Sequence, residues 1–343
     1  MCLENTGALI EIRRTNRNKK IKCFVTGATG LVGSYVVKSL VADGHKVVAF
    51  SRSDDGRWLD WILTEEEKTR VTRLKGDLLD TNCVRKAIVD NNCEFVANIA
   101  GRMNRDSRRD PKGSIQLNIH AFQNLLEICK EEKVRKIVWA SSSVLYGTKT
   151  DRAARYGVAM ADCTLTEKTP YCPGSLYSYT KEFLEGLSKY YREYHDLDTV
   201  ALRVNLVYGP FISSSYTPFF SSLIDKPALG EGGLVPYSDS IMDWQYVGDM
   251  GDIFRAVLLS PKNGTPTYQT RGELRPVSDA IKIVENLIPS VHLTSQPGEI
   301  DTPWKFDCSL LEKEISYYPS TSLEEGLRKS INTVRRSYGL PDV

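Results

Sequence analysis

Short apolar runs alternate with longer amphipathic stretches between residues 21 and 204, and this alternation restricts the fold more than any other feature. The runs are rich in β-branched residues, as buried parallel strands tend to be. The stretches between them carry apolar residues at helical spacing; Val32, Val36 and Leu40, for example, share one face. Such alternation predicts an α/β fold built on a doubly wound parallel sheet. The expected strands are 21–26, 46–51, 71–75, 94–99, 136–141 and 199–204, and the expected helices are 31–43, 82–91, 114–132 and 178–195.

Three glycines lie where the first expected strand meets the first expected helix, in the sequence TGATGLVG at 26–33. Gly27 allows a tight turn, Gly30 lets a pyrophosphate approach the backbone, and Gly33 allows close helix–strand packing. The helix N-terminus adds free N–H groups and the positive end of a dipole. A plain glycine-rich turn is the alternative, but the strand before and the helix after favour a dinucleotide site. The residues expected to contact the cofactor here are Gly27, Thr29, Gly30, Leu31 and Val32.

The end of the second expected strand indicates which dinucleotide binds. NAD-binding folds place an acid about twenty residues past the glycines, whereas Ser51 and Arg52 occupy that stretch here. Arg52 can pair bidentately with a 2′-phosphate, and no carboxylate repels it. A solvated surface arginine is the alternative, and Asp54 or Asp55 would be the acid if the strand ended two residues later. The sequence therefore predicts NADP, with NAD as the alternative cofactor.

Two further positions past strand ends are expected to contact the cofactor. Asp77, followed by Leu78, comes after the strand at 71–75, where a carboxylate can accept the adenine amino group. A helix N-cap is an equal alternative for Asp77. Ala100, just past the strand at 94–99, completes the expected cofactor contacts.

Tyr177 and Lys181 form the catalytic signal. Four residues apart on an expected helix, they project from the same face. A free phenol with a pKa of ~10 is a poor base at neutral pH. A nearby ammonium, together with the positive ring of an oxidised nicotinamide, favours the phenolate and lowers that pKa. An exposed i,i+4 pair is the alternative, although Tyr177 alone among the seventeen tyrosines is followed by lysine four residues later.

Three consecutive serines, 141–143, end the fifth expected strand at the edge where an active site should open. A hydroxyl there can hydrogen-bond a substrate carbonyl oxygen and polarise it. Ser142 is favoured by its spacing to Tyr146, while Ser143 and a solvated serine turn remain alternatives.

Together these residues resemble the extended short-chain dehydrogenases, also called the NAD-dependent epimerase/dehydratase family. The resemblance implies a triad of Ser142, Tyr177 and Lys181, hydride transfer at nicotinamide C4, and often a homodimer through a four-helix bundle. It also implies a catalytic-site role for Asn118, in the helix before the fifth strand. It covers about residues 21–265, and more loosely the rest, and rests on TGATGLVG, GD (76–77), SSSVLYG (141–147), YSYTK (177–181), RVNLVYGP (203–210) and YVGDM (246–250).

Three departures from the family pattern indicate a subfamily. Ser143 and the valine after it stand where sugar dehydratases carry an Asp-Glu pair. Leu206, with Asn205 one place earlier, stands where sugar-nucleotide enzymes usually carry Asn, and Met242 stands where they tend to carry Arg. The last two changes remove expected diphosphate-sugar contacts. With the NADP-like strand end, they favour the ketone and aldehyde reductases, such as dihydroflavonol-type reductases, over the dehydratases.

The leading hypothesis is therefore an NADP(H)-dependent oxidoreductase that interconverts a small ketone or aldehyde and its alcohol. The alternative is a nucleotide-sugar 4-epimerase, which oxidises and re-reduces one carbon on a tightly held NAD. A catalytically silent cofactor-sensing protein ranks last, because Tyr177 and Lys181 are both present. Residues 211–237 are aromatic and poor in charge, which suggests an apolar ligand, although core packing explains them equally well.

The character of the chain changes after residue 205. Segment 206–242 is rich in Ser, Pro, Gly and aromatics, and 266–343 mixes loops with helix-like runs near 276–288 and 322–338. These two segments predict a smaller C-terminal substrate-binding lobe over the open end of the sheet, where doubly wound folds bind ligands. The Rossmann-type dinucleotide-binding domain is then 21–205 plus 243–265, and 1–20 is an N-terminal extension.

The charge balance and the small number of histidines indicate which kinds of binding partner to expect. A net charge of +2, from 45 basic and 43 acidic residues, predicts no strong field for nucleic acid or an acidic membrane surface. Four histidines without metal-ligand spacing predict no metal. No apolar run approaches a membrane span and no secretory signal is evident, so a cytoplasmic location is expected.

Overall fold

The computed structural model describes residues 20–53, 55–160, 163–211, 218–261, 265–315 and 318–343. Residues 1–19 of the predicted extension, and the alternative acid Asp54, lie outside the described residues.

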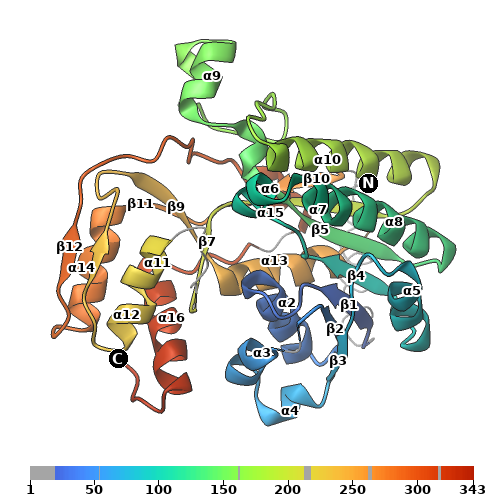
Figure 1. The fold of residues 1–343 in the computed structure, drawn as a ribbon, viewed down its shortest axis with the longest axis horizontal. Coiled ribbons are helices and arrows are strands. Elements are labelled where there is room, and N and C mark those ends of the chain that lie inside the picture. Colours follow the sequence, from blue (N-terminus) through green and yellow to red (C-terminus); the bar gives the residue numbers. More distant parts are fainter. Residues whose placement is uncertain (1–19, 54, 161–162, 212–217, 262–264, 316–317) are drawn as a thin grey trace, which may run out of the picture.

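A seven-stranded parallel sheet forms the centre of the molecule, with strand order β10-β6-β5-β4-β1-β2-β3 (Figure 1). The predicted α/β doubly wound fold is confirmed. Every one of the six expected strands is present, to within one residue at either end. Strand β10, Thr267–Gln269, lies past residue 265 and still pairs with β6, so the sheet extends into a segment assigned to the lobe. The other strands are β1 Lys22–Thr26, β2 Lys46–Ser51, β3 Val71–Lys75, β4 Phe95–Asn98, β5 Lys136–Ser142 and β6 Thr199–Val204.

Helices cover both faces of the sheet because successive strand residues point to opposite sides. Val25 and Ala49 lie in a core with α2 and α13, whereas Phe24 and Val48 lie in a second core with α5, α8 and α10. The bounds are α2 Leu31–Ala42, α5 Thr81–Asp90, α7 Pro111–Ile115, α8 Ala121–Glu131, α10 Leu176–Tyr194 and α13 Val247–Leu259. The expected helix 114–132 is interrupted by a π-helical turn at Gln116–His120, which joins α7 to α8.

A third core holds the smaller lobe together beside the open end of the sheet (Figure 1). Its strands β9 and β11 pair antiparallel, and the aromatic rings of Tyr208, Phe220 and Trp244 pack against one another. The expected helices near 276–288 and 322–338 are α14 and α16. The lobe elements are β7 Val207–Tyr208, α11 Pro218–Leu223, α12 Asp225–Ala228, β8 Gly233–Val235, β9 Ile241–Tyr246, β11 Glu273–Pro276, α14 Val277–Leu287, β12 Leu293–Ser295 and α16 Leu323–Ser337. The division into domain and lobe at the predicted boundaries stays a prediction.

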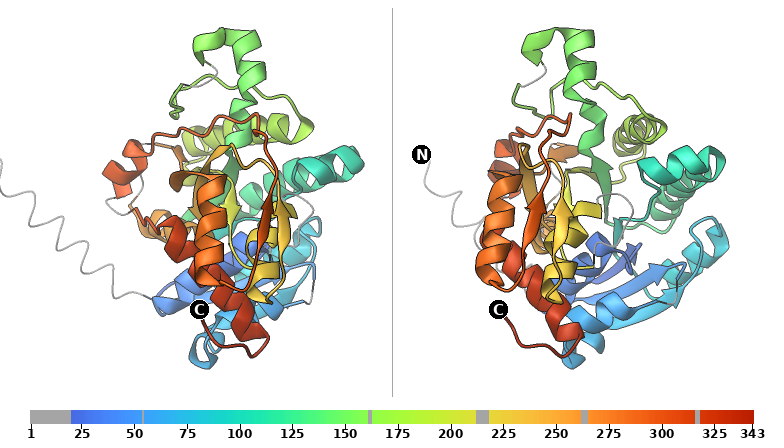
Figure 2. Two further views of the ribbon diagram at one scale, coloured as in Figure 1. Left: turned by 90° about the vertical axis from the view of Figure 1, so that its left-hand side faces the viewer. Right: turned by 60° about the vertical axis from the view of Figure 1, so that its left-hand side comes forward.

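Short helices complete the fold. Helix α9 stands away from the body in both views of Figure 2, and the buried Arg152 guanidinium fixes its base by donating to the carbonyls of Tyr146 and Pro170. The short helices are α3 Arg57–Ile62, α4 Glu65–Lys68, α6 Asn104–Arg109, α9 Lys149–Tyr156 and α15 Ser309–Ile315. Among the described residues, no helix is long and apolar enough to span a membrane.

Candidate active site

The glycine turn between β1 and α2 lies where the strand order reverses, because β1 is flanked by β2 on one side and β4 on the other. This switch point is where doubly wound sheets bind ligands. Gly27 has φ +63, and a Cβ on it would lie 2.9 Å from the Ala100 nitrogen. A Cβ on Gly33 would lie 2.1 Å from the Gly27 oxygen. Both glycines are therefore required by close backbone approach, as the sequence predicted.

The N-terminus of α2 is open for an anion. Gly30 is the N-cap, no side chain caps the helix, and no acidic residue lies in its first turn. Leu31 and Val32 pack against the lobe core. On the β4 side of the turn, the Ala100 N–H donates to Thr26 Oγ1 at 3.2 Å. Uncapped N–H groups at the positive end of a helix suit a pyrophosphate. The residues present thus fit a bound dinucleotide.

Alanine at Gly33 should disable this turn. The added methyl group would meet the Gly27 carbonyl, and overpacking of this kind destabilises by about 1–3 kcal/mol. We expect Gly33→Ala to fold with a lower Tm and to lose most bound cofactor, measured by denaturing extraction and chromatography. Gly186→Ala, where a Cβ would meet nothing within 4 Å, is the matched control. Full cofactor content in Gly33→Ala would contradict the assigned turn.

The end of β2 bears directly on the cofactor prediction. The strand ends at Ser51 as expected, and the Ser51 hydroxyl donates to the Ser53 carbonyl at 2.8 Å. Arg52 is exposed. Asp55 is held by the Arg57 guanidinium at 2.6 Å, beyond the strand end. The Ser51 hydroxyl proton is thus used within the turn, which weakens the predicted contact to a 2′-phosphate.

Asp77 is not the cap of α5. Its carboxylate accepts from Leu79 N at 2.9 Å, whereas Asp80 caps the helix by accepting from Cys83 N at 3.0 Å. Leu78 packs at the edge of the sheet core. The competing N-cap role is thereby removed, and the adenine contact of Asp77 stays a prediction.

Tyr177 and Lys181 lie on the first turns of α10, which starts with a capping box between Ser175 and Ser178. Both side chains are buried, with 8% and 6% of their surfaces exposed, so the exposed-pair alternative does not hold. Lys181 Nζ donates to the Ala140 carbonyl at 2.6 Å and lies 5.5 Å from the centroid of the Tyr177 ring. Burial lowers the pKa of Lys181 to about 8, while the Glu185 carboxylate acts in the opposite direction. A buried ammonium beside the phenol is the arrangement that favours a phenolate.

The three serines at the end of β5 serve different partners. Ser141 donates to Glu185 at 2.5 Å, and Ser143 donates to Asn205 Oδ1 at 2.9 Å. Ser142 Oγ accepts one long bond, 3.3 Å, from Val144 N. Of the three hydroxyls, that of Ser142 is the least committed to its neighbours, which supports it as the substrate-facing residue.

Asn118 lies in the π-helical turn and is buried. Its amide binds the backbone of Arg102 twice, accepting from the nitrogen at 2.8 Å and donating to the oxygen at 2.9 Å. A Cβ on Gly101 would lie 3.3 Å from Asn118 Oδ1 and 4.0 Å from Lys181 Nζ. Asn118 therefore fixes the loop after β4 beside Lys181, and a direct catalytic contact stays a prediction.

Glu185 and Arg203 belong to the site but were missed in the sequence. Glu185 follows Lys181 by one helical turn and receives the Arg203 guanidinium at 2.7 Å, with both side chains buried. Tyr171 donates to the same carboxylate at 2.7 Å. The i,i+4 spacing from Lys181 to Glu185 was a usable signal. No sequence pattern indicated the pairing with Arg203, which comes from a strand.

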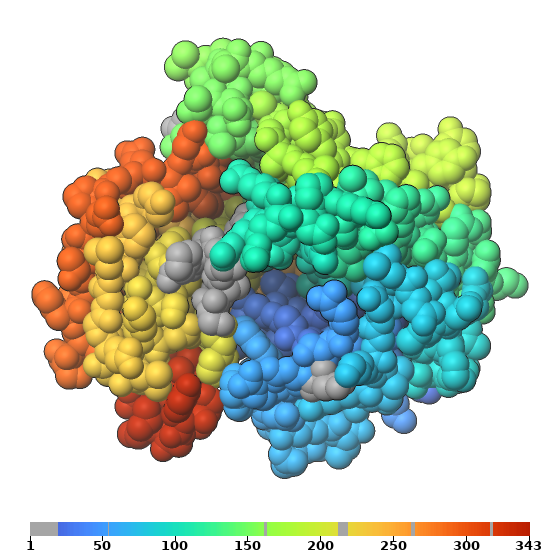
Figure 3. All heavy atoms as spheres, in the orientation of Figure 1, coloured from blue at the N-terminus to red at the C-terminus, as the bar shows by residue number. Residues whose placement is uncertain are grey.

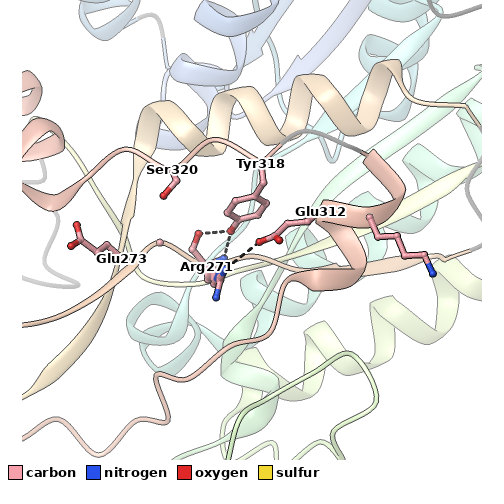
Figure 4. Close-up of a pocket in the computed structure, with 7 residues that line it drawn as sticks. Arg271, Glu273, Glu312, Tyr318 and Ser320 are labelled. Atoms are coloured by element: carbon pink, nitrogen blue, oxygen red, sulfur yellow. Dashed lines mark hydrogen bonds and ion pairs between the residues drawn. The ribbon is translucent and has the colours of Figure 1, made fainter. Parts of the chain in front are cut away.

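A second hollow, drawn in Figure 4, is separate from these residues. There Arg271 pairs with Glu312 at 3.2 Å, and the Arg271 nitrogen donates to the Tyr318 hydroxyl at 2.5 Å. Its lining contains none of the predicted site residues. Nor do the described His, Cys, Asp and Glu residues form any group that could hold a metal ion.

A glycine turn at the switch point of a doubly wound sheet, together with a buried Tyr–Lys pair, defines a dehydrogenase-type fold whose geometry fits a dinucleotide. The pattern of the NAD dependent epimerase/dehydratase family matches residues 23–269, and the chain belongs to this family. It is 28% identical to UDP-glucuronate 4-epimerase 4 of Arabidopsis thaliana, over 93% of this chain and 76% of that protein.

Solved structures of similar fold include UDP-N-acetylglucosamine 4-epimerase from Methanobrevibacter ruminantium in complex with UDP-N-acetylmuramic acid. That structure has a TM-score of 0.76 and 25% identity, covering 93% of this chain and 99% of the other. UDP-glucuronic acid 4-epimerase from Bacillus cereus, in complex with NAD, has a TM-score of 0.73 and 24% identity, covering 93% and 100%.

The prediction of an NADP-dependent ketone or aldehyde reductase is wrong, because relatives similar over nearly the whole chain are sugar-nucleotide 4-epimerases. The physical reason lies in the two departures taken as lost substrate contacts. Met242 is fully buried in the lobe core, and Leu206 packs against that core. These positions report on lobe packing, so their residue types did not exclude a nucleotide sugar.

Proposed function

We propose that this protein is an NAD-dependent 4-epimerase of nucleoside-diphosphate sugars. The observation that carries the proposal is the buried Tyr177–Lys181 pair beside the glycine turn, in a chain similar over nearly its full length to 4-epimerases. The hollow between sheet domain and lobe gives such a substrate room beside the cofactor (Figure 3).

The side chains of this site supply the proton chemistry. As phenolate, Tyr177 takes the proton of the sugar 4-hydroxyl while the C4 hydrogen leaves as hydride, and it returns the proton when the ketone is reduced. Lys181 stabilises the phenolate, and Ser142 holds the reacting oxygen. A nicotinamide dinucleotide held at the glycine turn would supply the hydride acceptor and donor that this chemistry needs. No net oxidation occurs, so one cofactor serves repeated turnovers.

NAD replaces NADP in this proposal. The Ser51 hydroxyl donates within its own turn, and the B. cereus 4-epimerase is a complex with NAD. Residues Gly27, Gly30 and the start of α2 would hold the pyrophosphate, and Asp77 the adenine.

The test incubates the purified protein with UDP-glucose, UDP-N-acetylglucosamine and UDP-glucuronate in separate reactions, followed by proton NMR. We expect one of them to convert to its 4-epimer without added cofactor. Denatured protein should release NAD rather than NADP. Stoichiometric NADPH consumption with a ketone, and no epimer from any sugar, would overturn the proposal.

We also propose a homodimer formed by the outer faces of α8 and α10. Helix α10 exposes four aromatic side chains, Tyr179, Phe183, Tyr190 and Tyr194, each more than half exposed. Exposed aromatic groups of this kind mark protein interfaces. Phe183→Glu should convert a dimer into a monomer in light scattering, while Tyr338→Glu, at an exposed ring just past the end of α16, should not. A wild-type monomer at micromolar concentration would contradict the dimer.

A further inference from the structure

Phe211 is held in an unfavourable backbone conformation at the border between lobe and sheet domain. Its φ is +57, a region that bulky residues rarely adopt. Its N–H donates to Asp225 Oδ1 at 2.7 Å, and burial raises the pKa of that carboxyl to about 6. A strained aromatic residue and a half-buried carboxylate with a raised pKa are both unfavourable, and both are used here to fix one ring.

That ring rests on two tryptophans of the other domain. The Phe211 centroid lies 4.2 Å from that of Trp61 and 5.5 Å from that of Trp58 in an edge-to-face contact. Both tryptophans belong to α3, which begins six residues after β2 ends at Ser51. The ring contact therefore ties the lobe to the segment that follows the cofactor-binding strand end.

The residues just before Phe211 lie on the phosphate-binding turn. A Cβ on Gly209 would lie 3.2 Å from Leu31 Cδ1, and Leu31 is the first residue of α2. The stretch from Gly209 to Phe211 thus passes from the pyrophosphate end of the cofactor site to the α3 tryptophans. In Figure 3 the hollow between the two parts is bordered by the lobe on one side and by the segment after β2 on the other.

We infer that Trp58, Trp61, Phe211 and Asp225 form a clasp that holds the lobe against the cofactor-binding domain and slows release of the dinucleotide. The inference rests on the proposed function, since an epimerase must return the hydride to the substrate before the cofactor leaves. Ordinary core packing does not account for the arrangement. Phe211 packs against the edge of the buried lobe core, but Trp61 on its other side remains 36% exposed and a small hollow of about 290 Å³ lies beside the rings.

The test measures release of bound NADH by its fluorescence after mixing with excess NAD, in wild type, Phe211→Ala, Trp61→Ala and the double variant. We expect each single variant to release NADH about tenfold faster or more, and the double variant to be little faster than either. Such non-additivity identifies one shared contact. Tyr338→Ala removes another ring that lines the same hollow and should leave the release rate unchanged.

Folding is checked by Tm, and Phe211→Leu, which keeps apolar volume without a ring, replaces Phe211→Ala if that variant is unfolded. Release rates within twofold of wild type in folded variants would overturn the clasp. Epimerase activity is measured in parallel with saturating NAD, so the two proposals fail separately. Faster NADH release from the variants of a protein that epimerises no sugar would support the clasp and contradict the proposed function. Unchanged release from the variants of an active epimerase would support the proposed function and contradict the clasp.

Discussion

Tyr177→Phe is expected to lower the epimerisation rate by about 10²-fold or more, the scale of a positioned acid–base group. The variant loses the hydroxyl that takes and returns the proton but keeps the ring that is buried on α10. The measurement is kcat by NMR under saturating substrate. Bound NAD and Tm should match those of wild type, because the packing is retained.

Tyr179→Phe is the matched control, since that ring lies two residues away on the same helix and is more than half exposed. It should retain wild-type kcat. A near-normal rate in Tyr177→Phe would show that another group takes the proton.

Lys181→Met is expected to remove activity by a similar factor while making the cofactor-free protein more stable at pH 7. Burial lowers the pKa of Lys181 from 10.5 to about 8, so the native state holds this cation at a free-energy cost. At about 1.4 kcal/mol per pKa unit, that cost is on the order of 3 kcal/mol. The lost hydrogen bond to Ala140 offsets part of it, at about 1 kcal/mol or more.

The pH dependence separates this explanation from a general packing effect. Between pH 8 and 10.5 the native state has released the Lys181 proton and the unfolded chain has not, so the wild-type free energy of unfolding should rise with pH across this window. Lys181→Met lacks that contribution, so the excess of its free energy of unfolding over that of wild type should be largest below pH 8. Urea unfolding at pH 7, 8 and 9 measures the difference. A variant less stable than wild type at pH 7 would contradict the predicted desolvation cost.

The sheet, the glycine turn and the Tyr–Lys pair were predictable because each follows from local pattern. Strand periodicity located β1 to β6, and the spacing of Gly27, Gly30 and Gly33 is dictated by close backbone contacts. The π-helical turn around Asn118 could not be predicted, because the spacing of apolar residues does not distinguish it from a continuous α-helix. The helix α13 was missed although Met250, Phe254 and Val257, with other buried apolar residues, repeat at helical spacing, which was a usable signal.

The substrate class was mispredicted because residue types at single positions were given more weight than the surroundings that decide what those residues do. Met242 and Leu206 looked like lost ligand contacts until the lobe core around them was known. Ser51 looked like a hydrogen-bond donor to a 2′-phosphate until its hydroxyl was seen to donate to the Ser53 carbonyl. Long-range packing of this kind brings together residues far apart in the chain, and a single sequence does not record it.

Strand β10 pairs with β6 but is synthesised much later, so the order of synthesis affects how the sheet folds. Its partner β6 is complete by Val204, but the edge of β6 has no strand to pair with until Gln269 has been made. At ~5–20 residues per second, translation leaves that edge open for about 3–13 s. An unpaired edge invites association with other nascent chains. The ribosome-bound intermediate, rather than the finished enzyme, is therefore the form most exposed to aggregation, and slower translation between these two strands should lower the yield of folded protein.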